Sequence, residues 1–209
     1  MSRGASGGAR LSRAAREQQI IDGAAALAVE HGCLPLPLDV LGQRVGVSKA
    51  LVYAYFPTQQ DLANRILVQH LQEMAQAVDA ALRAPSPREA ALRCAEAYFD
   101  HAARNGPLLH LLLSDPMAAG ALWPEVRALY GRLMRRLANG LRDHFGVPSR
   151  DCIAALHILA ALAEDAGEQV FTTRLDPELG RRLAREMTDG ALCELSARLQ
   201  RPPRALAAS

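Results

Sequence analysis

Residues 38–62 read LDVLGQRVGVSKALVYAYFPTQQDL, and their pattern decides the fold. Two short segments with apolar residues at helical spacing, 38–45 and 49–55, predict two helices joined by a tight turn. Gly46 in the turn accepts the positive φ that a sharp change of direction requires, and Ser48 is placed to cap the second helix. The pattern predicts a helix-turn-helix unit, which presents its second helix to a DNA major groove.

The sequence on either side of this unit predicts one long helix before it and one after it. Ser12 is placed to cap the first of these, and Gly32 ends it. The two prolines within 33–37 then exclude helix up to residue 38. Thr58 caps the following helix, with Asp61 in the first turn, and that helix is predicted to end at about residue 83.

Prolines and glycines divide the remainder of the chain into further helices. Helical patterns remain at about 87–104, 107–114, 118–145, 149–172 and 176–200. No strand pattern and no internal repeat is present in the sequence. We therefore predict an all-α fold of about nine helices, divided into a flexible basic arm at 1–11, a three-helix helix-turn-helix domain at 12–57, a second helical domain at 58–200 and a disordered tail at 201–209.

Composition narrows the class of protein. Half of the 209 residues are hydrophobic, so the chain can bury a core. The sequence contains no run of 18 apolar residues, which a membrane-spanning helix would require. The N-terminus lacks the apolar stretch of a signal peptide, and we expect a cytoplasmic bacterial protein with no membrane partner. The spacing of Cys33, Cys94, Cys152 and Cys193 favours reduced, mostly buried thiols over a disulfide framework or a zinc site, with a redox sensor as the alternative.

The small net charge of +2 is unevenly distributed. Residues 1–70 carry seven Lys or Arg against five Asp or Glu, whereas residues 71–209 carry seventeen of each. The excess is greatest in the first nineteen residues, where a polyanion such as DNA would be met.

The segment 45–62, VGVSKALVYAYFPTQQDL, resembles the signature of the tetracycline-repressor (TetR) family, which reads roughly A-G-V-S-x-G-T-L-Y-x-Y/H-F-x-S/N-K-E-x-L. The resemblance is sharp over about residues 13–65, and the number and length of the predicted helices match the family across the chain. Three positions depart from the pattern: Pro37, Leu51 and Gln59 replace two threonines and a lysine, which removes a cap, a hydroxyl and a cation. The resemblance implies a DNA-binding transcription regulator, acting as a repressor that a small-molecule effector releases from a palindromic operator.

The resemblance also implies roles for individual residues. Lys49, the only lysine in the chain, and Ala50 would face base edges, while the two tyrosines would contact phosphates or bases. The predicted DNA contacts are Arg13, Arg16, Arg44, Ser48, Lys49, Ala50, Tyr53, Tyr55 and Gln59. The alternative is a structural helical hairpin without DNA contact, in which Tyr53, Tyr55 and Phe56 belong to the core.

The second domain is expected to dimerise through its last two helices, 149–172 and 176–200. Small residues crowd the first of these helices, and leucines with Met187 form a stripe along the second. A twofold dimer presents two recognition helices to half-sites about one DNA turn apart, so the operator is expected to be a palindrome.

The resemblance implies an effector pocket among the central helices, 87–145. We predict that it is lined by Tyr98, Phe99, His101, His110, Met117, Trp123, Tyr130 and Met134, with His157 and Asp165 reaching in from the next helix. For each of these residues, ordinary core packing is the alternative interpretation. His157, Glu164 and Glu168 share a helical stripe that a metal ion could use, but ion pairing with the many arginines is favoured, and no metal or cofactor is expected.

Two other functional classes are weighed against the regulator. The sequence contains no GxGxxG, P-loop, HExxH or GxSxG motif, which argues against a small helical enzyme. A helical adaptor would be favoured by a fixed repeat, and none exists. The sequence leaves open the effector, the operator, the regulated genes and the direction of regulation.

Overall fold

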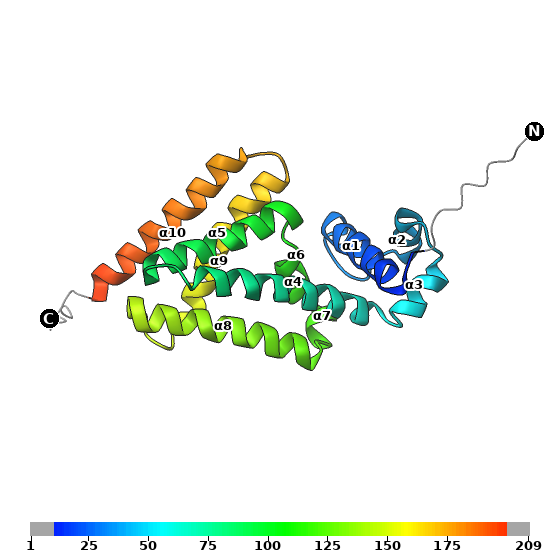
Figure 1. The fold of residues 1–209 in the computed structure, drawn as a ribbon, viewed down its shortest axis with the longest axis horizontal. Coiled ribbons are helices and arrows are strands. Elements are labelled where there is room, and N and C mark those ends of the chain that lie inside the picture. Colours follow the sequence, from blue (N-terminus) through cyan, green and yellow to red (C-terminus); the bar gives the residue numbers. More distant parts are fainter. Residues whose placement is uncertain (1–10, 200–209) are drawn as a thin grey trace, which may run out of the picture.

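The computed structural model describes residues 11–199, which form ten helices and no strand (Figure 1), so the predicted all-α fold is confirmed. The predicted tail at 201–209 and the predicted arm, apart from Leu11, lie outside the described residues. The helices are α1 Arg13–His31, α2 Leu38–Val45, α3 Lys49–Tyr55, α4 Gln59–Ala81, α5 Pro87–Asn105, α6 Leu108–Ser114, α7 Pro116–Gly120, α8 Pro124–Phe145, α9 Cys152–Phe171 and α10 Pro177–Leu199.

The predicted capping residues begin and end these helices. The Ser12 hydroxyl accepts a hydrogen bond from the Ala15 N–H at the start of α1, and Gly32 ends that helix in the left-handed conformation. Thr58 and Asp61 form a reciprocal capping box at the start of α4, in which each side chain accepts from the other residue's backbone N–H. The helix boundaries in this part of the chain therefore follow from local sequence.

One predicted helix was wrong, because the segment 118–145 is divided into α7 and α8. Pro124 has no N–H to continue a helix and holds Trp123 in an extended conformation, with ψ at 149°. The division raises the number of helices among the described residues to ten instead of about nine.

Asn64 of α4 holds the connection between these two helices from the side. Its side chain is fully buried, its amide nitrogen donates to the Ala121 carbonyl oxygen at 2.9 Å, and its carbonyl oxygen accepts from the Trp123 N–H at 2.8 Å. These bonds satisfy two backbone groups that the interruption of the helix leaves free. A buried asparagine thus fixes the entry to α8, a role that no sequence pattern indicated.

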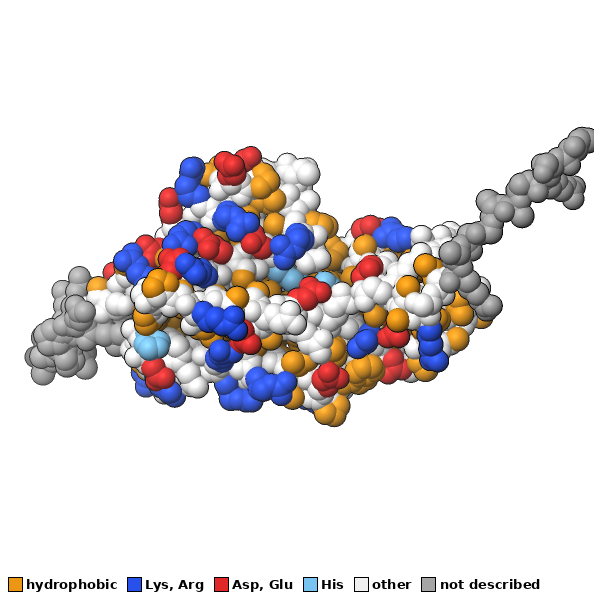
Figure 2. All heavy atoms as spheres, in the orientation of Figure 1, with side chains coloured by type: hydrophobic (Ala, Val, Ile, Leu, Met, Phe, Trp, Pro, Cys, Tyr) orange, Lys and Arg blue, Asp and Glu red, His pale blue; other side chains and the backbone are white. Residues whose placement is uncertain are grey.

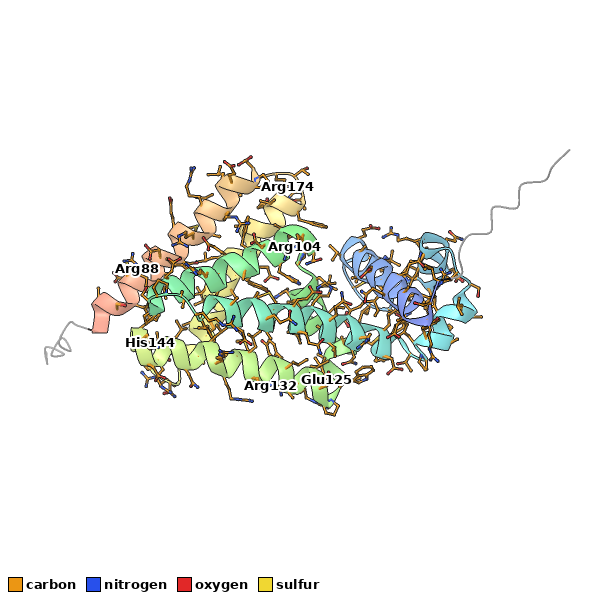
Figure 3. All side chains as sticks on the ribbon, viewed as in Figure 1. Arg88, Arg104, Glu125, Arg132, His144 and Arg174 are labelled. Atoms are coloured by element: carbon orange, nitrogen blue, oxygen red, sulfur yellow. The ribbon has the colours of Figure 1, made fainter. Side chains whose placement is uncertain are left out.

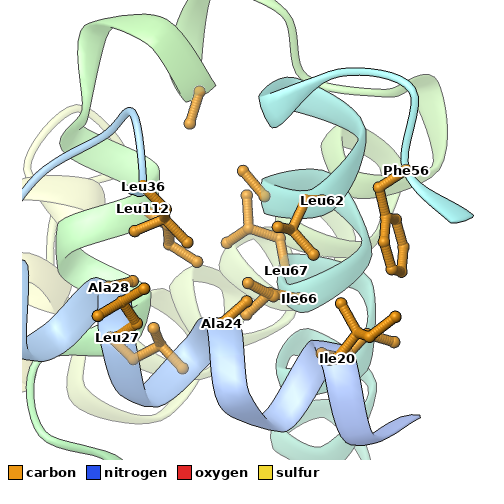
Figure 4. Close-up of a cluster of buried hydrophobic side chains, with 14 of the residues drawn as sticks. Ile20, Ala24, Leu27, Ala28, Leu36, Phe56, Leu62, Ile66, Leu67 and Leu112 are labelled. Atoms are coloured by element: carbon orange, nitrogen blue, oxygen red, sulfur yellow. The ribbon is translucent and has the colours of Figure 1, made fainter. Parts of the chain in front are cut away.

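Helix α4 joins a small unit of α1–α3 to a larger bundle made mainly of α5, α8, α9 and α10 (Figure 1). Its first half packs against α1, and along its length it also packs against α5, α6, α7 and α8. One buried apolar cluster includes Ile20 and Ala24 of α1, Ile66 and Leu67 of α4, and Leu112 of α6 (Figure 4). The core is therefore continuous across the domain boundary predicted at residues 57 and 58.

Two buried histidines connect α4 to α5. His70 Nδ1 and His101 Nε2 lie 3.1 Å apart and their rings meet edge to face, which requires one nitrogen to donate and the other to accept. Burial lowers the pKa of both imidazoles, that of His101 to about 4, although Glu73 beside His70 opposes the shift at His70. Both rings are consequently neutral in the folded protein near pH 7.

We predict that this pair makes the protein sensitive to mild acid. The folded-state pKa of His101 lies below its unfolded value, so the stabilisation is complete above about pH 6.5 and is lost as the pH falls towards 4, by about 3 kcal/mol. Urea unfolding at pH 7 and pH 4.5 should show a smaller fall in unfolding free energy for His101→Gln than for the wild-type chain. The exposed His31→Gln is the control; an equal fall in all three proteins would contradict the prediction.

Candidate DNA-binding face and effector cavity

The turn between α2 and α3 depends on a close approach of backbone atoms. Gly46 has φ at 68°, and the Val47 N–H donates to the Gly42 carbonyl oxygen at 2.8 Å. A Cβ atom on Gly42 would lie only 2.6 Å from the Val47 carbonyl oxygen. Glycine at position 42 therefore allows α3 to begin directly against α2, a role that no sequence pattern indicated.

Helix α3 buries one side and exposes the other. Val52 is 1% exposed and belongs to the core, whereas Lys49, Ala50, Leu51 and Tyr53 are exposed; we call these four residues the recognition face. The Ser48 hydroxyl accepts a hydrogen bond from the Leu51 N–H, and its own proton is left to donate outwards. Four of the predicted DNA contacts, Ser48, Lys49, Ala50 and Tyr53, are thus accessible together.

Cations near the recognition face are largely neutralised by neighbouring acids. Lys49 Nζ lies 2.9 Å from an Asp39 carboxylate oxygen, and this hydrogen bond raises the pKa of Lys49. Arg44 forms a two-pronged ion pair with Glu30. In the view of Figure 2, few Lys or Arg side chains lie over α1–α3, and many lie mixed with acids over the larger bundle. The positive electrostatic potential at the recognition face is thus weaker than the number of predicted basic contacts suggests.

The remaining predicted DNA contacts make intramolecular interactions. The Arg13 guanidinium lies 5.9 Å from the centre of the half-buried Tyr55 ring, and Arg16 donates to the Gln19 side chain. Gln59 accepts from the Leu36 N–H and donates to the Leu36 carbonyl oxygen, which ties the loop before α2 to α4. Gln59 therefore has a structural role that no sequence pattern indicated, and Tyr55 packs against the core, as the structural alternative expected.

A cavity of about 780 Å³ lies inside the larger bundle, between α4, α5, α6, α8, α9 and α10; we call it the central cavity. Its walls include Leu71, Met74 and Val78 of α4. Along α8, a helix that begins near Glu125 and ends near His144 (Figure 3), it extends as far as His144 and Phe145. Five predicted effector contacts line it, namely Tyr98, His110, Tyr130, Met134 and His157.

The other five predicted effector contacts do not line this cavity, namely Phe99, His101, Met117, Trp123 and Asp165. Phe99 packs with Ala163 and Ala184 at the contact between α5, α9 and α10, and His101 is paired with His70. Trp123 packs against the core beside α4, and Asp165 is exposed. Helical spacing alone did not distinguish the side of α5 that faces the cavity, which carries Tyr98, from the adjacent side, which carries Phe99.

Among the described residues, Glu164 is the one carboxylate that lines the central cavity. Its carboxylate oxygen lies 3.9 Å from Nδ1 of His110, and burial raises its pKa, although His110 and the Tyr98 hydroxyl oppose the shift. No group of three His, Cys, Asp or Glu side chains within residues 11–199 is arranged to hold a metal ion. Glu164 is therefore placed to accept hydrogen bonds or to face a cation.

The four cysteines are free in the structure, and only part of the expectation of buried thiols was correct. Cys152 is buried and Cys94 is half-buried, with burial raising the pKa of Cys94 to about 11, whereas Cys33 and Cys193 are exposed. None of the helices within residues 11–199 is both long and apolar enough to cross a membrane.

Comparisons with known proteins agree with this geometry. A sequence profile described as "Bacterial regulatory proteins, tetR family" matches residues 20–66, which include α2, α3, the later part of α1 and the beginning of α4. The chain is 33% identical over 94 residues to the HTH-type transcriptional activator FasR of Mycolicibacterium smegmatis, a match that covers 44% of this chain and 43% of FasR. The chain thus matches less than half the length of that relative.

Solved structures extend the likeness to nearly the whole chain. A TetR-like transcriptional regulator from Rhodococcus sp. RHA1 superposes with a TM-score of 0.69 at 20% identity, covering 90% of this chain and 99% of the other. The TetR-family transcriptional regulator PfmR from Thermus thermophilus gives a TM-score of 0.64 at 25% identity, covering 83% and 97%.

We predict that Gly42→Ala destabilises the α2–α3 unit. The added methyl group meets a backbone oxygen that cannot move without displacing α3, so the unfolding free energy should fall by about 1–3 kcal/mol. Thermal and urea unfolding followed by circular dichroism measure the change. Gly120→Ala is the matched control, because a methyl group there meets nothing within 4 Å; equal stability of the two variants would refute the close-approach argument.

Proposed function

We propose that this chain, a TetR-family transcriptional regulator with a helix-turn-helix DNA-binding domain, binds a palindromic operator as a homodimer and leaves it when a small molecule occupies the central cavity. The observation that carries the DNA-binding part is the recognition face, where one lysine, one tyrosine and two small or apolar side chains are exposed together on a capped helix. Membership of a family of DNA-binding regulators also favours this function over the enzyme and adaptor alternatives.

Each side chain of the recognition face suits one kind of DNA contact. Lys49 can donate to guanine acceptors or to phosphate, and the exposed Tyr53 hydroxyl can donate to phosphate. Ala50 and Leu51 offer apolar contact to thymine methyl groups. Leu51, 38% exposed, is therefore a candidate base contact in place of the threonine that the family pattern has at that position.

The proposed dimer uses α9 and α10, as the small residues and the leucine stripe predict. Support comes from large apolar side chains that these helices leave in solvent, with Ile153 45% and Ile158 66% exposed on α9 and Met187 51% exposed on α10. Exposed apolar side chains gathered on two neighbouring helices are typical of an interface between subunits.

Helix α4 is proposed to carry the signal between cavity and DNA. Leu62 and Ile66 of α4 pack in the core shared with α1–α3, while Leu71, Met74 and Val78 line the central cavity. An effector that prefers a different position of α4 would change the separation of the two recognition helices in the dimer. A difference of a few kcal/mol in affinity between the two states is sufficient.

The direction of regulation has two candidates. Release of a repressor follows from the family resemblance, whereas the named relative FasR is a transcriptional activator. A reporter gene placed behind the selected operator distinguishes them, because loss of the protein raises expression under a repressor and lowers it under an activator.

We predict that selection from random duplex DNA enriches a palindrome with the wild-type chain and that Tyr53→Ala abolishes or greatly weakens this enrichment. The exposed tyrosine contributes to DNA binding but not to the core, so the variant should remain folded. Arg150→Ala is the control, since Arg150 lies far along the chain with its side chain 87% exposed. Absence of any enriched sequence for a folded wild-type dimer at low salt would refute the regulator function.

We also predict that Asp39→Asn tightens operator binding about threefold to tenfold, more at low salt than at high salt. The substitution removes a negative charge beside DNA and frees Lys49 from its ion pair. Fluorescence anisotropy of a labelled operator at two salt concentrations measures the effect. Asp143→Asn, which breaks the exposed Arg142 pair on α8, should leave affinity unchanged; weaker binding by Asp39→Asn would show that the ion pair positions Lys49 for DNA.

A further inference from the structure

Glu164 of the larger bundle combines a largely buried side chain with the lack of an arginine partner among the described residues. Acids on the neighbouring helices are paired: Glu89 and Glu96 with Arg185, Asp100 with Arg181, and Asp189 with Arg88. Glu164, with its side chain only 16% exposed, has one ion-pair partner within residues 11–199, His110, whose imidazole is charged only when protonated. In a chain with 24 basic residues, a largely buried carboxylate without a permanent cation is unusual.

The charges that line the central cavity leave this carboxylate uncompensated. Arg136 is the one arginine that the described part of the chain contributes to the lining, and it is engaged with Asp79 in an ion pair. Glu168, one turn after Glu164 on α9, adds to the negative potential there, since its charge raises the pKa of Glu164. Burial of an ionised carboxylate is unfavourable without a partner, so a cation in the cavity would be bound more strongly than an anion of the same size.

Two tyrosines complete the surroundings of Glu164. Tyr98 interacts with the Glu164 carboxylate, and Tyr130 lies near Tyr98. Both line the central cavity. Aromatic faces beside a carboxylate attract an ammonium group through both cation–π and charge interactions, and the gain is larger where water is excluded.

The rest of the cavity is suited to an apolar chain. Most of its lining is aliphatic, with Leu71, Met74, Leu137, Leu141 and Leu192 among its walls. Its volume of about 780 Å³ lies within the range of sites that enclose molecules of drug or lipid size.

A second polar group lies unpartnered in the same lining. Thr188 of α10 is 2% exposed, and its hydroxyl is the one buried side-chain oxygen or nitrogen within the described residues that has no hydrogen-bond partner. An unpaired buried hydroxyl is unfavourable, so a ligand that carries a hydrogen-bonding group at this wall would gain affinity.

We propose that the central cavity binds an amphipathic cation, with its positively charged nitrogen beside Glu164, Tyr98 and Tyr130 and its apolar chain along the aliphatic walls. A polar group on the chain would satisfy Thr188. This inference rests on the proposed function, in which the central cavity is the effector site, and it names the chemical class of the effector.

Isothermal titration of the full-length protein tests the charge preference directly. Decyltrimethylammonium, used well below its micelle-forming concentration, is the cationic probe, and decanoate and decanol are the anionic and neutral probes with the same chain. The cation is expected to bind about tenfold or more tightly than either of the other two. Tighter binding of decanoate, or equal binding of all three probes, would overturn the proposal.

Glu164→Gln keeps the shape of the side chain and removes its charge. It is expected to weaken binding of the cation by about tenfold or more and to leave decanol binding unchanged. Glu125→Gln, at an exposed acid of α8 outside the cavity lining, is the matched control (Figure 3). Unchanged binding of the cation by a folded Glu164→Gln protein would overturn the assignment of Glu164, and circular dichroism establishes that each variant is folded.

Titration with and without the selected operator separates this proposal from the regulator function. Cation binding that depends on Glu164 supports the ligand class even if no operator is found. Release of a selected operator by decanoate but not by the cation would support the regulator function and overturn the ligand class.

Discussion

The burial of α4 against both parts of the molecule is the constraint on which the rest of the structure depends. Its first half carries Leu62 and Ile66 into the core shared with α1, and its second half carries Leu71 and Met74 into the wall of the central cavity. Within the first half, the buried Asn64 side chain bonds to the backbone that connects α7 to α8. Because packed cores transmit displacement instead of absorbing it, a movement of α4 would displace both the core shared with α1 and the wall of the central cavity.

This arrangement explains how a pocket and a distant helix can be coupled without a flexible hinge between them. The hydrogen bonds of Asn64 and the His70–His101 contact hold α4 to the connection before α8 and to α5, so these helices are linked through α4. In the proposed mechanism, a ligand that repacks the cavity wall would change the orientation of α1–α3 through this one helix. The coupling requires two packed arrangements that differ by a few kcal/mol, which is the usual scale of such equilibria.

Charge is arranged differently in the two functional regions. On the surface, arginines and acids form exposed pairs that contribute little to stability, and near α3 such pairs occupy Lys49 and Arg44. Such exposed pairs can exchange for phosphate at low cost, so both cations would be available to DNA under the proposed function. The cavity differs from the surface in both respects, because Glu164 is largely buried and lacks a permanently charged partner among the described residues. Under the proposals made above, ion pairing would therefore set the DNA affinity at one end of the molecule and the ligand preference at the other.

Elements whose causes are local could be predicted from the sequence. Capping by Ser12, Ser48 and Thr58, left-handed glycines and helix-breaking prolines act within a few residues, so the helix-turn-helix and nearly all helix boundaries could be predicted. Three features became visible only in the folded chain: Asn64 secures the break before α8, Gln59 bonds to Leu36, and one particular side of α5 faces the cavity. These features depend on which helix packs against which side chain over long sequence separations, and periodicity along one helix carries no information about its neighbour.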